Sequence, residues 1–300
     1  MKKTVLFLFF SISFLMAKPI VTTSILPTKY FVEQIAGDSV DINVMVEKGA
    51  DPHTYEPKPN QMKNLENSVL YFAVGIDFEH AWLDRFKKSY PNLIFVDTAI
   101  GINKIAMLKH EHDHEKHDKD HKSHSSHKEH DNHKHEDSHN GLDPHIWLDP
   151  ILVKTQAQNI ANALIKAFPE NKDLYSKNLE KFISNLDELD KFINDKLVNV
   201  KNRSFIVYHP SWGYFAKRYD LKQIPIEIEG KEPKMSDLSE LIKEAKEEKI
   251  KVIFVAPQFS KKSANLIANQ TNANVIEIDQ LPENWDDSMR KTAEIFSKSL

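Results

Sequence analysis

Short apolar runs alternate with amphipathic stretches along residues 20–100 of the chain. Strands are predicted where apolar residues follow one another, at 20–25, 40–46, 69–74 and 93–96. Helices are predicted where apolar residues recur at every third or fourth position, at 29–35, 61–67 and 78–88. Strands that alternate with helices in this way are typical of a mainly parallel sheet flanked by helices.

The last third of the chain repeats this alternation. The predicted strands lie at 204–208, 223–228, 251–255 and 274–278, and the predicted helices at 212–219, 235–248, 260–269 and 285–299. We therefore predict an α/β fold of two lobes, 18–170 and 200–300, each with a mainly parallel sheet flanked by helices.

Between the two lobes, residues 171–199 follow a helical pattern without a break. Neither Gly nor Pro interrupts the segment, and apolar residues recur at spacings of four and three: Tyr175, Leu179, Phe182, Leu186, Leu189, Ile193 and Leu197. The pattern predicts one amphipathic helix of roughly 40 Å. A coiled coil exposed to solvent is the alternative, but the position between two α/β halves favours one long rigid helix that joins them.

The N-terminal residues have the pattern of an export signal. Lys2 and Lys3 precede a short apolar run that ends at Met16, and cleavage is predicted after Ala17, so that residues 1–17 form a signal peptide. The run is shorter than the roughly 20 residues of a membrane-spanning helix, although an uncleaved anchor is the alternative. No cysteine follows the cleavage point, which excludes a lipid anchor. A periplasmic protein without a stable membrane anchor is expected.

Composition and charge limit which metal ligands the chain can offer and which kinds of molecule it can bind. The chain contains no cysteine, so His, Asp and Glu are the strong metal ligands that it can offer. The formal net charge is −4, and removal of Lys2 and Lys3 takes the mature chain to −6 (−4 − 2). A nucleic-acid-binding protein needs a basic surface, so this charge balance argues against nucleic acid as a partner and suits a cation binder.

Residues 110–139 form a tract without a single apolar side chain. The tract contains eleven histidines and nine acidic residues, and the histidines are His110, His112, His114, His117, His121, His124, His127, His130, His133, His135 and His139. A segment that can bury nothing is expected to be a disordered loop inserted after the fourth strand. Imidazole suits Zn²⁺, Cu²⁺ and Ni²⁺, so the tract is interpreted as an auxiliary metal collector, with a solvated loop of no function as the alternative.

Four histidines lie outside the tract, and three of them border predicted strands or the start of a helix. His53 follows the second predicted strand, His145 precedes a helix where the tract ends, and His209 ends the first strand of the second lobe. Asp279 likewise ends the last predicted strand. His80 lies inside the predicted helix 78–88 and is interpreted as an ordinary helix-surface residue.

Parallel α/β sheets bind ligands beside the carboxyl ends of their strands. Two lobes that face each other would bring the three histidines and Asp279 to one cleft. Three imidazoles and one carboxylate form a closed tetrahedral set that suits zinc. Each histidine alone could be a capping or core residue, but the coincidence of all four residues at matching positions favours a shared metal site.

The motifs around these residues resemble those of the metal-binding receptors of ABC-type zinc and manganese importers, specifically the ZnuA-like zinc receptors. The matching segments are DPHTYEP at 51–57, DPHIWLDP at 143–150, Tyr-His at 208–209 and Ile-Asp at 278–279. The acidic His-rich insertion before the second motif, the long central helix and the GKEP stretch at 230–233 are similar as well. The resemblance extends over residues 18–300.

The resemblance implies two α/β lobes with the metal held between them. It implies ligands at His53, His145 and His209, with Asp279 as fourth ligand, although water or a glutamate beside the first histidine serves in some relatives. Here Pro52 occupies that neighbouring position, which strengthens Asp279. Manganese-type relatives place Glu where this chain has His209, and a nitrogen donor favours Zn²⁺ over Mn²⁺. The disulfide that is frequent in the second lobe of the family cannot form without cysteine.

A ligating imidazole usually donates its other N–H to a carboxylate or a carbonyl. The nearby acids Glu56, Asp143, Asp149 and Glu232 are candidates for that task, or they are caps and surface charges.

The predicted function is high-affinity capture of Zn²⁺ in the periplasm by a monomer and its delivery to the membrane permease of an ABC importer. Four protein ligands leave no open position for a catalytic water, so the protein is interpreted as a binding protein and not as an enzyme. The alternatives are a receptor for manganese or another divalent metal, a metal-dependent adhesin or buffer, and, more distantly, a zinc hydrolase with Asp279 as base.

Overall fold

The computed structural model describes residues 17–108, 141–228 and 230–300. Residues 1–16 of the predicted signal peptide and the whole histidine tract lie outside these ranges. Within them, no helix combines the length and the apolar character that crossing a membrane requires.

The first lobe contains a four-stranded parallel sheet in the order β2-β1-β3-β4. Its strands are β1 (Ile20–Thr23), β2 (Asp41–Val44), β3 (Ser68–Ala73) and β4 (Ile94–Asp97). The helices are α1 (Leu26–Ala36), α2 (Pro59–Glu66) and α3 (Asp77–Ser89), with a short 3₁₀ turn, η1, at Gly37–Ser39. Every predicted strand and helix of this lobe is present, with ends that differ by a few residues.

The second lobe repeats the arrangement in the order β6-β5-β7-β8, again with all strands parallel. Its strands are β5 (Ser204–Val207), β6 (Lys222–Pro225), β7 (Val252–Val255) and β8 (Asn274–Glu277). Its helices are α6 (Gly213–Arg218), α7 (Met235–Glu247), α8 (Lys262–Thr271) and α9 (Trp285–Ser299). The predicted fold class, two parallel α/β lobes, is confirmed.

Two helices lie between the sheets in the sequence. The sequence pattern predicted that a helix starts near residue 150 but not its extent, and the structure shows α4 at Pro150–Ala167, after the 3₁₀ turn η2 (Ile146–Leu148). Asp149 caps α4, because its carboxylate accepts hydrogen bonds from the backbone N–H groups of Ile151 and Leu152. A further 3₁₀ turn, η3 (Pro169–Asn171), leads into α5 (Lys172–Leu197).

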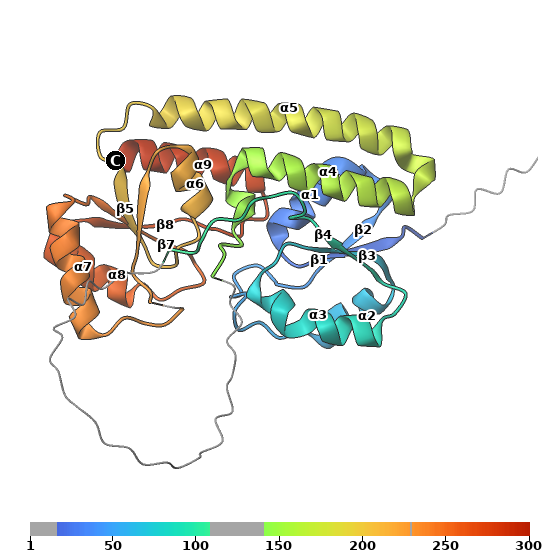
Figure 1. Ribbon diagram of the computed structural model, residues 1–300, viewed down its shortest axis with the longest axis horizontal. Helices are drawn as coiled ribbons and strands as arrows, with labels where there is room; N and C mark the ends of the chain where they lie inside the picture. Colours follow the sequence, from blue (N-terminus) through green and yellow to red (C-terminus); the bar gives the residue numbers. More distant parts are fainter. Residues whose placement is uncertain (1–16, 109–140, 229) are drawn as a thin grey trace, which may run out of the picture.

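Helix α5 lies along the outside of both lobes and packs on α4, α1 and α9 (Figure 1). The seven apolar residues of the helical pattern are all buried, Tyr175 to Leu197, so the helix is not stranded in solvent. The prediction of one long helix that joins the lobes is confirmed. The exact lobe limits at 170 and 200 stay a prediction.

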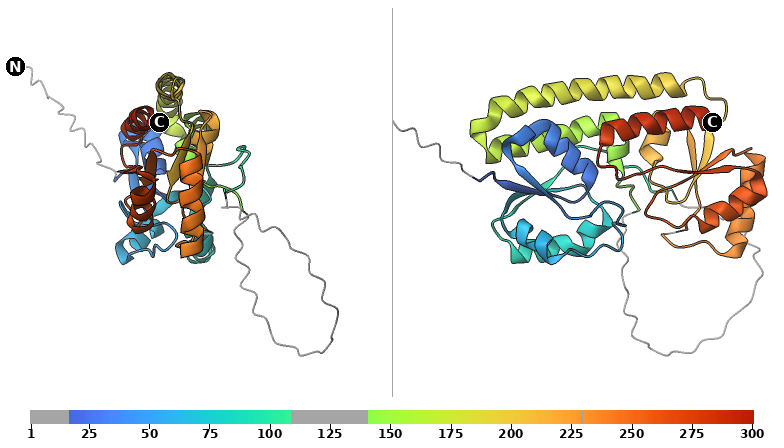
Figure 2. Two further views of the ribbon diagram at one scale, coloured as in Figure 1. Left: turned by 90° about the vertical axis from the view of Figure 1, so that its left-hand side faces the viewer. Right: turned by 180° about the vertical axis from the view of Figure 1, so that it is seen from behind.

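Helices α4, α5 and α9 lie along one side of the two sheets (Figure 2), and one apolar core extends through both lobes and includes the buried faces of these helices. The Phe31 ring of α1 lies 5.1 Å from the Trp285 ring of α9 and 5.9 Å from the Phe182 ring of α5. Within the second lobe, Phe296 of α9 stacks on Phe254 at 4.4 Å. A smaller core lies beneath α7 and α8. Because a large apolar interface resists relative motion, this shared core holds the two sheets in a fixed relation.

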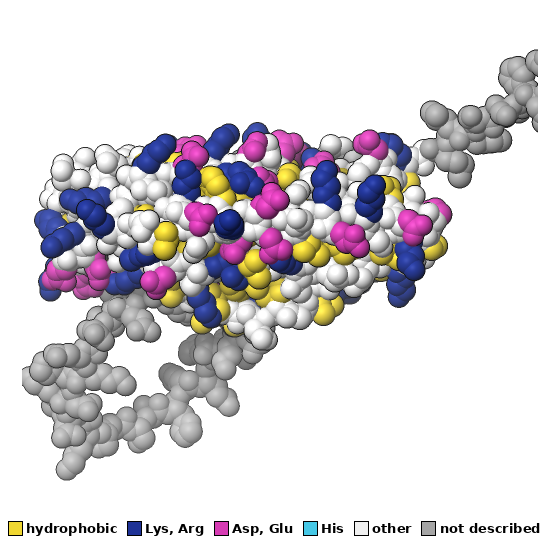
Figure 3. Space-filling view, turned by 90° about the horizontal axis from the view of Figure 1, so that it is seen from above, with side chains coloured by type: hydrophobic (Ala, Val, Ile, Leu, Met, Phe, Trp, Pro, Cys, Tyr) yellow, Lys and Arg dark blue, Asp and Glu magenta, His cyan; other side chains and the backbone are white. Residues whose placement is uncertain are grey.

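The face formed by the long helices carries basic and acidic side chains side by side, with no large area of one sign (Figure 3).

The shared core leads to a prediction about stability. Phe182→Ala is expected to lower the free energy of unfolding by about 3–5 kcal/mol, because it leaves a cavity where α5 meets α1. Urea denaturation measures the change. Lys181→Ala, on the exposed side of the same helix, is the control and should change the free energy by less than about 0.5 kcal/mol. Equal effects of the two substitutions would contradict a core role for α5.

Candidate metal centre

Segments from both lobes meet at a small pocket beside the carboxyl ends of the strands. Its lining includes His53 and Asp77 from the first lobe, His145 from the turn before α4, and Gln280 and Leu281 from the loop after β8. Ligand sites of parallel α/β sheets occupy this position.

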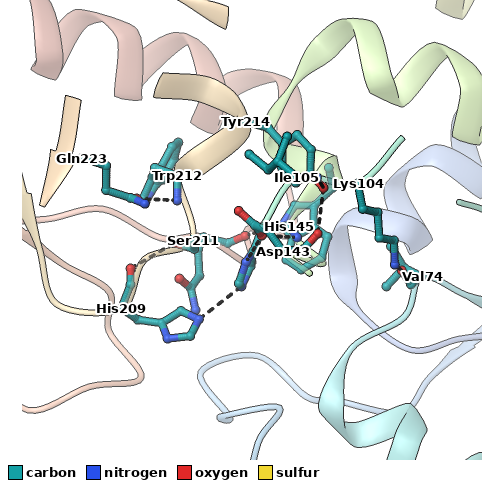
Figure 4. A network of polar contacts seen from close by, with 12 residues as sticks. Val74, Lys104, Ile105, Asp143, His145, His209, Ser211, Trp212, Tyr214 and Gln223 are labelled. Atoms are coloured by element: carbon teal, nitrogen blue, oxygen red, sulfur yellow. Dashed lines mark hydrogen bonds and ion pairs between the residues drawn. The ribbon is translucent and has the colours of Figure 1, made fainter. Parts of the chain in front are cut away.

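Three of the four predicted ligands lie close together: His53 and His145 line this pocket, and His209 is next to both. The His209 ring centroid lies 5.0 Å from that of His145 and also 5.0 Å from that of His53. The Nε2 atoms of His145 and His209 are 3.2 Å apart, and the two rings point toward each other (Figure 4). Residues separated by 64 positions in the sequence thus present ring nitrogens to one point.

Each of these two rings is oriented by a buried carboxylate. Nδ1 of His145 lies 2.7 Å from Oδ1 of Asp143, and Nδ1 of His209 lies 2.7 Å from Oε1 of Glu227. An ionised carboxylate can only accept a hydrogen bond, so Nδ1 carries the proton on both rings and the two Nε2 lone pairs face each other. The four side chains are at most 7% exposed. Two lone pairs held 3.2 Å apart in a buried site favour a cation between them.

His53 is oriented in the same way but is less enclosed. Its Nδ1 contacts a carboxylate oxygen of Asp77, the first residue of α3. Its backbone N–H donates to Asp51 Oδ1 at 3.0 Å, which shapes the loop after β2. The His53 side chain is 37% exposed, whereas His145 and His209 are nearly inaccessible.

The surroundings shift the pKa values of two of these histidines in opposite directions. Burial lowers the pKa of His145, and the nearby His209 and His53 lower it further, although Asp143 opposes the shift. Burial also acts to lower the pKa of His53, but the hydrogen bond and charge of Asp77 outweigh it and raise the pKa. His145 is therefore neutral at pH 7 and able to coordinate a metal.

A second buried carboxylate, Glu79 of α3, braces the turn that carries Asp77. Glu79 accepts hydrogen bonds from the backbone N–H groups of Val74 and Gly75 and from the Ser24 hydroxyl at the end of β1. Burial raises the pKa of Glu79 even though these donors act to lower it. The turn after β3 is thereby tied to the neighbouring strand.

Asp279 lies two residues beyond the end of β8, and its carboxylate Oδ1 is engaged by other groups. Asp279 Oδ1 accepts hydrogen bonds from Gln258 Nε2 at 3.2 Å and from the Leu281 backbone N–H at 2.9 Å. Within the described ranges, no three His, Asp or Glu side chains are arranged so closely that they could hold a metal ion as they stand. The complete four-ligand set therefore stays a prediction.

Of the acids named as possible partners of the ligands, Asp143 contacts one of the histidines. Asp149 instead caps α4 and pairs with Arg218, Glu232 accepts a hydrogen bond from Ser263, and Glu56 is exposed. His80 is exposed on α3, as predicted.

The sequence reading missed Asp77 and Glu227. Both stand a few residues after a strand, where the signal that identified the histidines could also have identified them. The histidines of the tract 110–139 lie outside the described residues.

Two parallel-sheet lobes joined by a long helix, with imidazoles gathered between them, define a two-lobed solute-binding receptor. The profile of the family described as "Zinc-uptake complex component A periplasmic" (ZnuA) matches residues 21–299, and the chain belongs to this family. The predicted resemblance is thereby confirmed. The members of this family are solute-binding components of zinc uptake systems and not enzymes.

Similar proteins with curated names support this assignment. The chain is 31% identical over 257 residues to the high-affinity zinc uptake system protein ZnuA of Bacillus subtilis. The match covers 84% of this chain and 75% of that protein. It is 28% identical over 283 residues to the zinc-binding protein AdcA of Streptococcus pyogenes. That match covers 92% of this chain but 53% of AdcA, so the chain spans about half of that relative.

Solved structures agree with the fold. A crystal structure of ZnuA superposes with a TM-score of 0.81 at 37% identity and covers 94% of this chain and 99% of that chain. The structure of a ZnuA deletion mutant with zinc bound gives the same TM-score and identity and covers 98% of that chain.

The His53–Asp77 pair leads to a pH prediction. Asp77→Asn should lower the pKa of His53, because it removes the charge that raises it; proton NMR titration of the His53 ring measures the change. Asp84→Asn, exposed on the same helix, is the control. Because the pKa is raised from 6.5 in the fold, the pair stabilises the folded protein fully below pH 6.5 and loses this effect as pH rises through the raised value. An unchanged His53 pKa in Asp77→Asn would contradict the pairing.

Proposed function

We propose that this chain is the zinc receptor of an uptake system, which captures Zn²⁺ between its two lobes. The observation that carries the proposal is the pair of Nε2 atoms 3.2 Å apart, each on a ring oriented by a carboxylate. Two nitrogens bound to one zinc ion at about 2.0–2.1 Å and at the tetrahedral angle lie about 3.3–3.4 Å apart. The geometry of this pair therefore matches half of a tetrahedral zinc site.

The donor set favours zinc over harder cations. Imidazole nitrogen suits Zn²⁺, whereas Mn²⁺, Mg²⁺ and Ca²⁺ favour oxygen donors. Three imidazoles at one pocket therefore support zinc against the manganese alternative. The names of the similar proteins from B. subtilis and S. pyogenes agree with this choice.

We propose Asp279 as the fourth ligand. The loop that begins at Asp279 borders the pocket, because Trp147 Nε1 donates to the Gln280 carbonyl at 2.7 Å and Leu281 is part of the pocket lining. On this proposal the Asp279 side chain turns away from Gln258 when zinc binds and presents a carboxylate oxygen to the metal. Four protein ligands would then close the zinc shell, as in a site that binds without catalysis.

The remaining parts of the proposal rest on the sequence. Residues 1–17 direct export, with cleavage after Ala17, and the mature chain acts as a monomer in the periplasm. The histidine tract 110–139 serves as an auxiliary collector of weakly bound zinc near the site. The loaded receptor delivers Zn²⁺ to the membrane permease of an ABC importer.

The ligand assignment can be tested by substitution. His209→Ala should weaken zinc binding by more than about 100-fold, which exceeds the usual effect of losing an outer partner of a metal ligand. Competition against a chelator of known affinity measures the change. His80→Ala removes an exposed histidine from α3 and should leave the affinity unchanged. Tight binding that survives in His209→Ala would refute the site.

The role of the tract calls for a separate experiment. Deletion of residues 110–139 should remove several weak zinc sites and leave the single tight site intact, because the proposed ligands lie outside the deleted segment. Isothermal titration calorimetry distinguishes the two classes by stoichiometry and affinity. Loss of the tight site on deletion would show that the tract supplies a primary ligand.

A further inference from the structure

The turn that carries His145, residues 143–149, is fastened to the second lobe at several points. Trp147 Nε1 donates to the Gln280 carbonyl at 2.7 Å, and Trp285 Nε1 donates to the Trp147 carbonyl at 2.8 Å. Asp149, at the end of the turn, pairs with Arg218 of α6. Although the turn leads into α4 of the first lobe, these contacts all come from elements of the second lobe.

The start of the turn is held by Tyr214, also in α6. The Tyr214 hydroxyl donates to the Asp143 carbonyl at 2.8 Å and accepts from the Ile105 N–H at 3.1 Å (Figure 4). Ile105 and Asp143 are themselves joined, because the Asp143 N–H donates to the Ile105 carbonyl at 2.8 Å. One hydroxyl of the second lobe thus bridges two neighbouring segments of the first.

The packing around this hydroxyl is close. Gly213 precedes Tyr214, and a Cβ atom at Gly213 would lie 2.6 Å from Asp143 Oδ2. The other carboxylate oxygen of Asp143 accepts from both the backbone N–H of His145 at 2.9 Å and its ring Nδ1 at 2.7 Å. The position of the His145 ring therefore follows from that of Asp143, which α6 determines.

Burial raises the pKa of Tyr214 to about 12. The phenol therefore keeps its proton at neutral pH and can donate to the Asp143 carbonyl.

His53 is held differently. Its Nδ1 partner Asp77 belongs to α3 of the first lobe, and its side chain is 37% exposed. His145 and His209 are 5% and 2% exposed and are both held by the second lobe, His209 through Glu227. Two of the three imidazoles thus form a unit, and the third approaches it from the other lobe.

We infer that Tyr214 is a positioning residue of the zinc site: its hydroxyl fastens the turn 143–149 to the second lobe, so that His145 and His209 form a pre-assembled pair that His53 completes. The inference rests on the proposed function. Pre-assembly means that the pair does not have to be ordered when zinc binds, which favours tight binding.

The first test compares two tyrosines of the same region. Tyr214→Phe should increase the rate of zinc release to a chelator and weaken binding by about 10-fold, the lower end of the effect of losing an outer partner of a metal ligand, because Tyr214 holds Asp143, which is the partner of His145. Tyr219→Phe is the matched control, because it removes a hydroxyl that donates to Asp190 of α5 at 2.9 Å and contacts none of the histidines. Co²⁺ absorption in both variants reports the ligand geometry, and thermal denaturation reports the fold.

The second test combines substitutions. In a His145→Ala background, Tyr214→Phe should have no further effect on zinc affinity, because the hydroxyl acts through His145. In a His53→Ala background the full effect of Tyr214→Phe should remain. A role in general stability would instead weaken binding in both backgrounds.

The outcomes separate the two proposals. If the wild-type protein does not bind zinc tightly, the proposed function is wrong. If the wild-type protein binds zinc but Tyr214→Phe matches Tyr219→Phe in affinity, release rate and Co²⁺ spectrum, or shows the same effect in both histidine backgrounds, the positioning role of Tyr214 is wrong.

Discussion

The continuous apolar core beneath α1, α4, α5 and α9 is the constraint on which the rest of the structure depends. It joins two sheets that share no strand, and ring contacts such as Phe31 with Trp285 pass directly from one lobe to the other. Because this core is apolar and extends through both lobes, it keeps the carboxyl ends of the two sheets at a fixed separation. A site that draws side chains from both lobes requires that separation to be correct to a fraction of an ångström.

Within the site, the two ring nitrogens of each histidine have different tasks. Each of the three clustered histidines presents Nδ1 to a carboxylate, Asp77, Asp143 or Glu227, and this leaves Nε2 for the pocket. The acids thus determine both the tautomer and the direction of the ring. The site therefore has two parts. His145 and His209 are buried and held by the second lobe, whereas His53 is held by Asp77 of the first lobe.

Much of the fold could be predicted from the sequence, because the strands lie in short stretches rich in apolar residues that alternate with amphipathic helical segments. The long helix was equally clear, since apolar residues at spacings of four and three from Tyr175 to Leu197 fit one face. Helix α4 was predicted only at its start, which Asp149 and Pro150 mark, although Pro169, two residues beyond the last helical residue Ala167, is a comparable signal for its end. The three histidines could be identified because they are few and each borders a strand end or a helix start, whereas Asp77 and Glu227 stand in similar positions but were passed over among the 44 acidic residues of the chain.

The sequence by itself determined which ligand types are available, with no cysteine and few histidines outside the tract, and where in each lobe they stand. These are local properties, which composition and hydrophobic periodicity reveal. Only the tertiary structure decided that His145 and His209 face each other at 3.2 Å, that Asp279 Oδ1 is bound to Gln258, and that Tyr214 of one lobe holds a turn of the other. Such relations depend on the relative placement of two separately folded sheets, which no local pattern encodes.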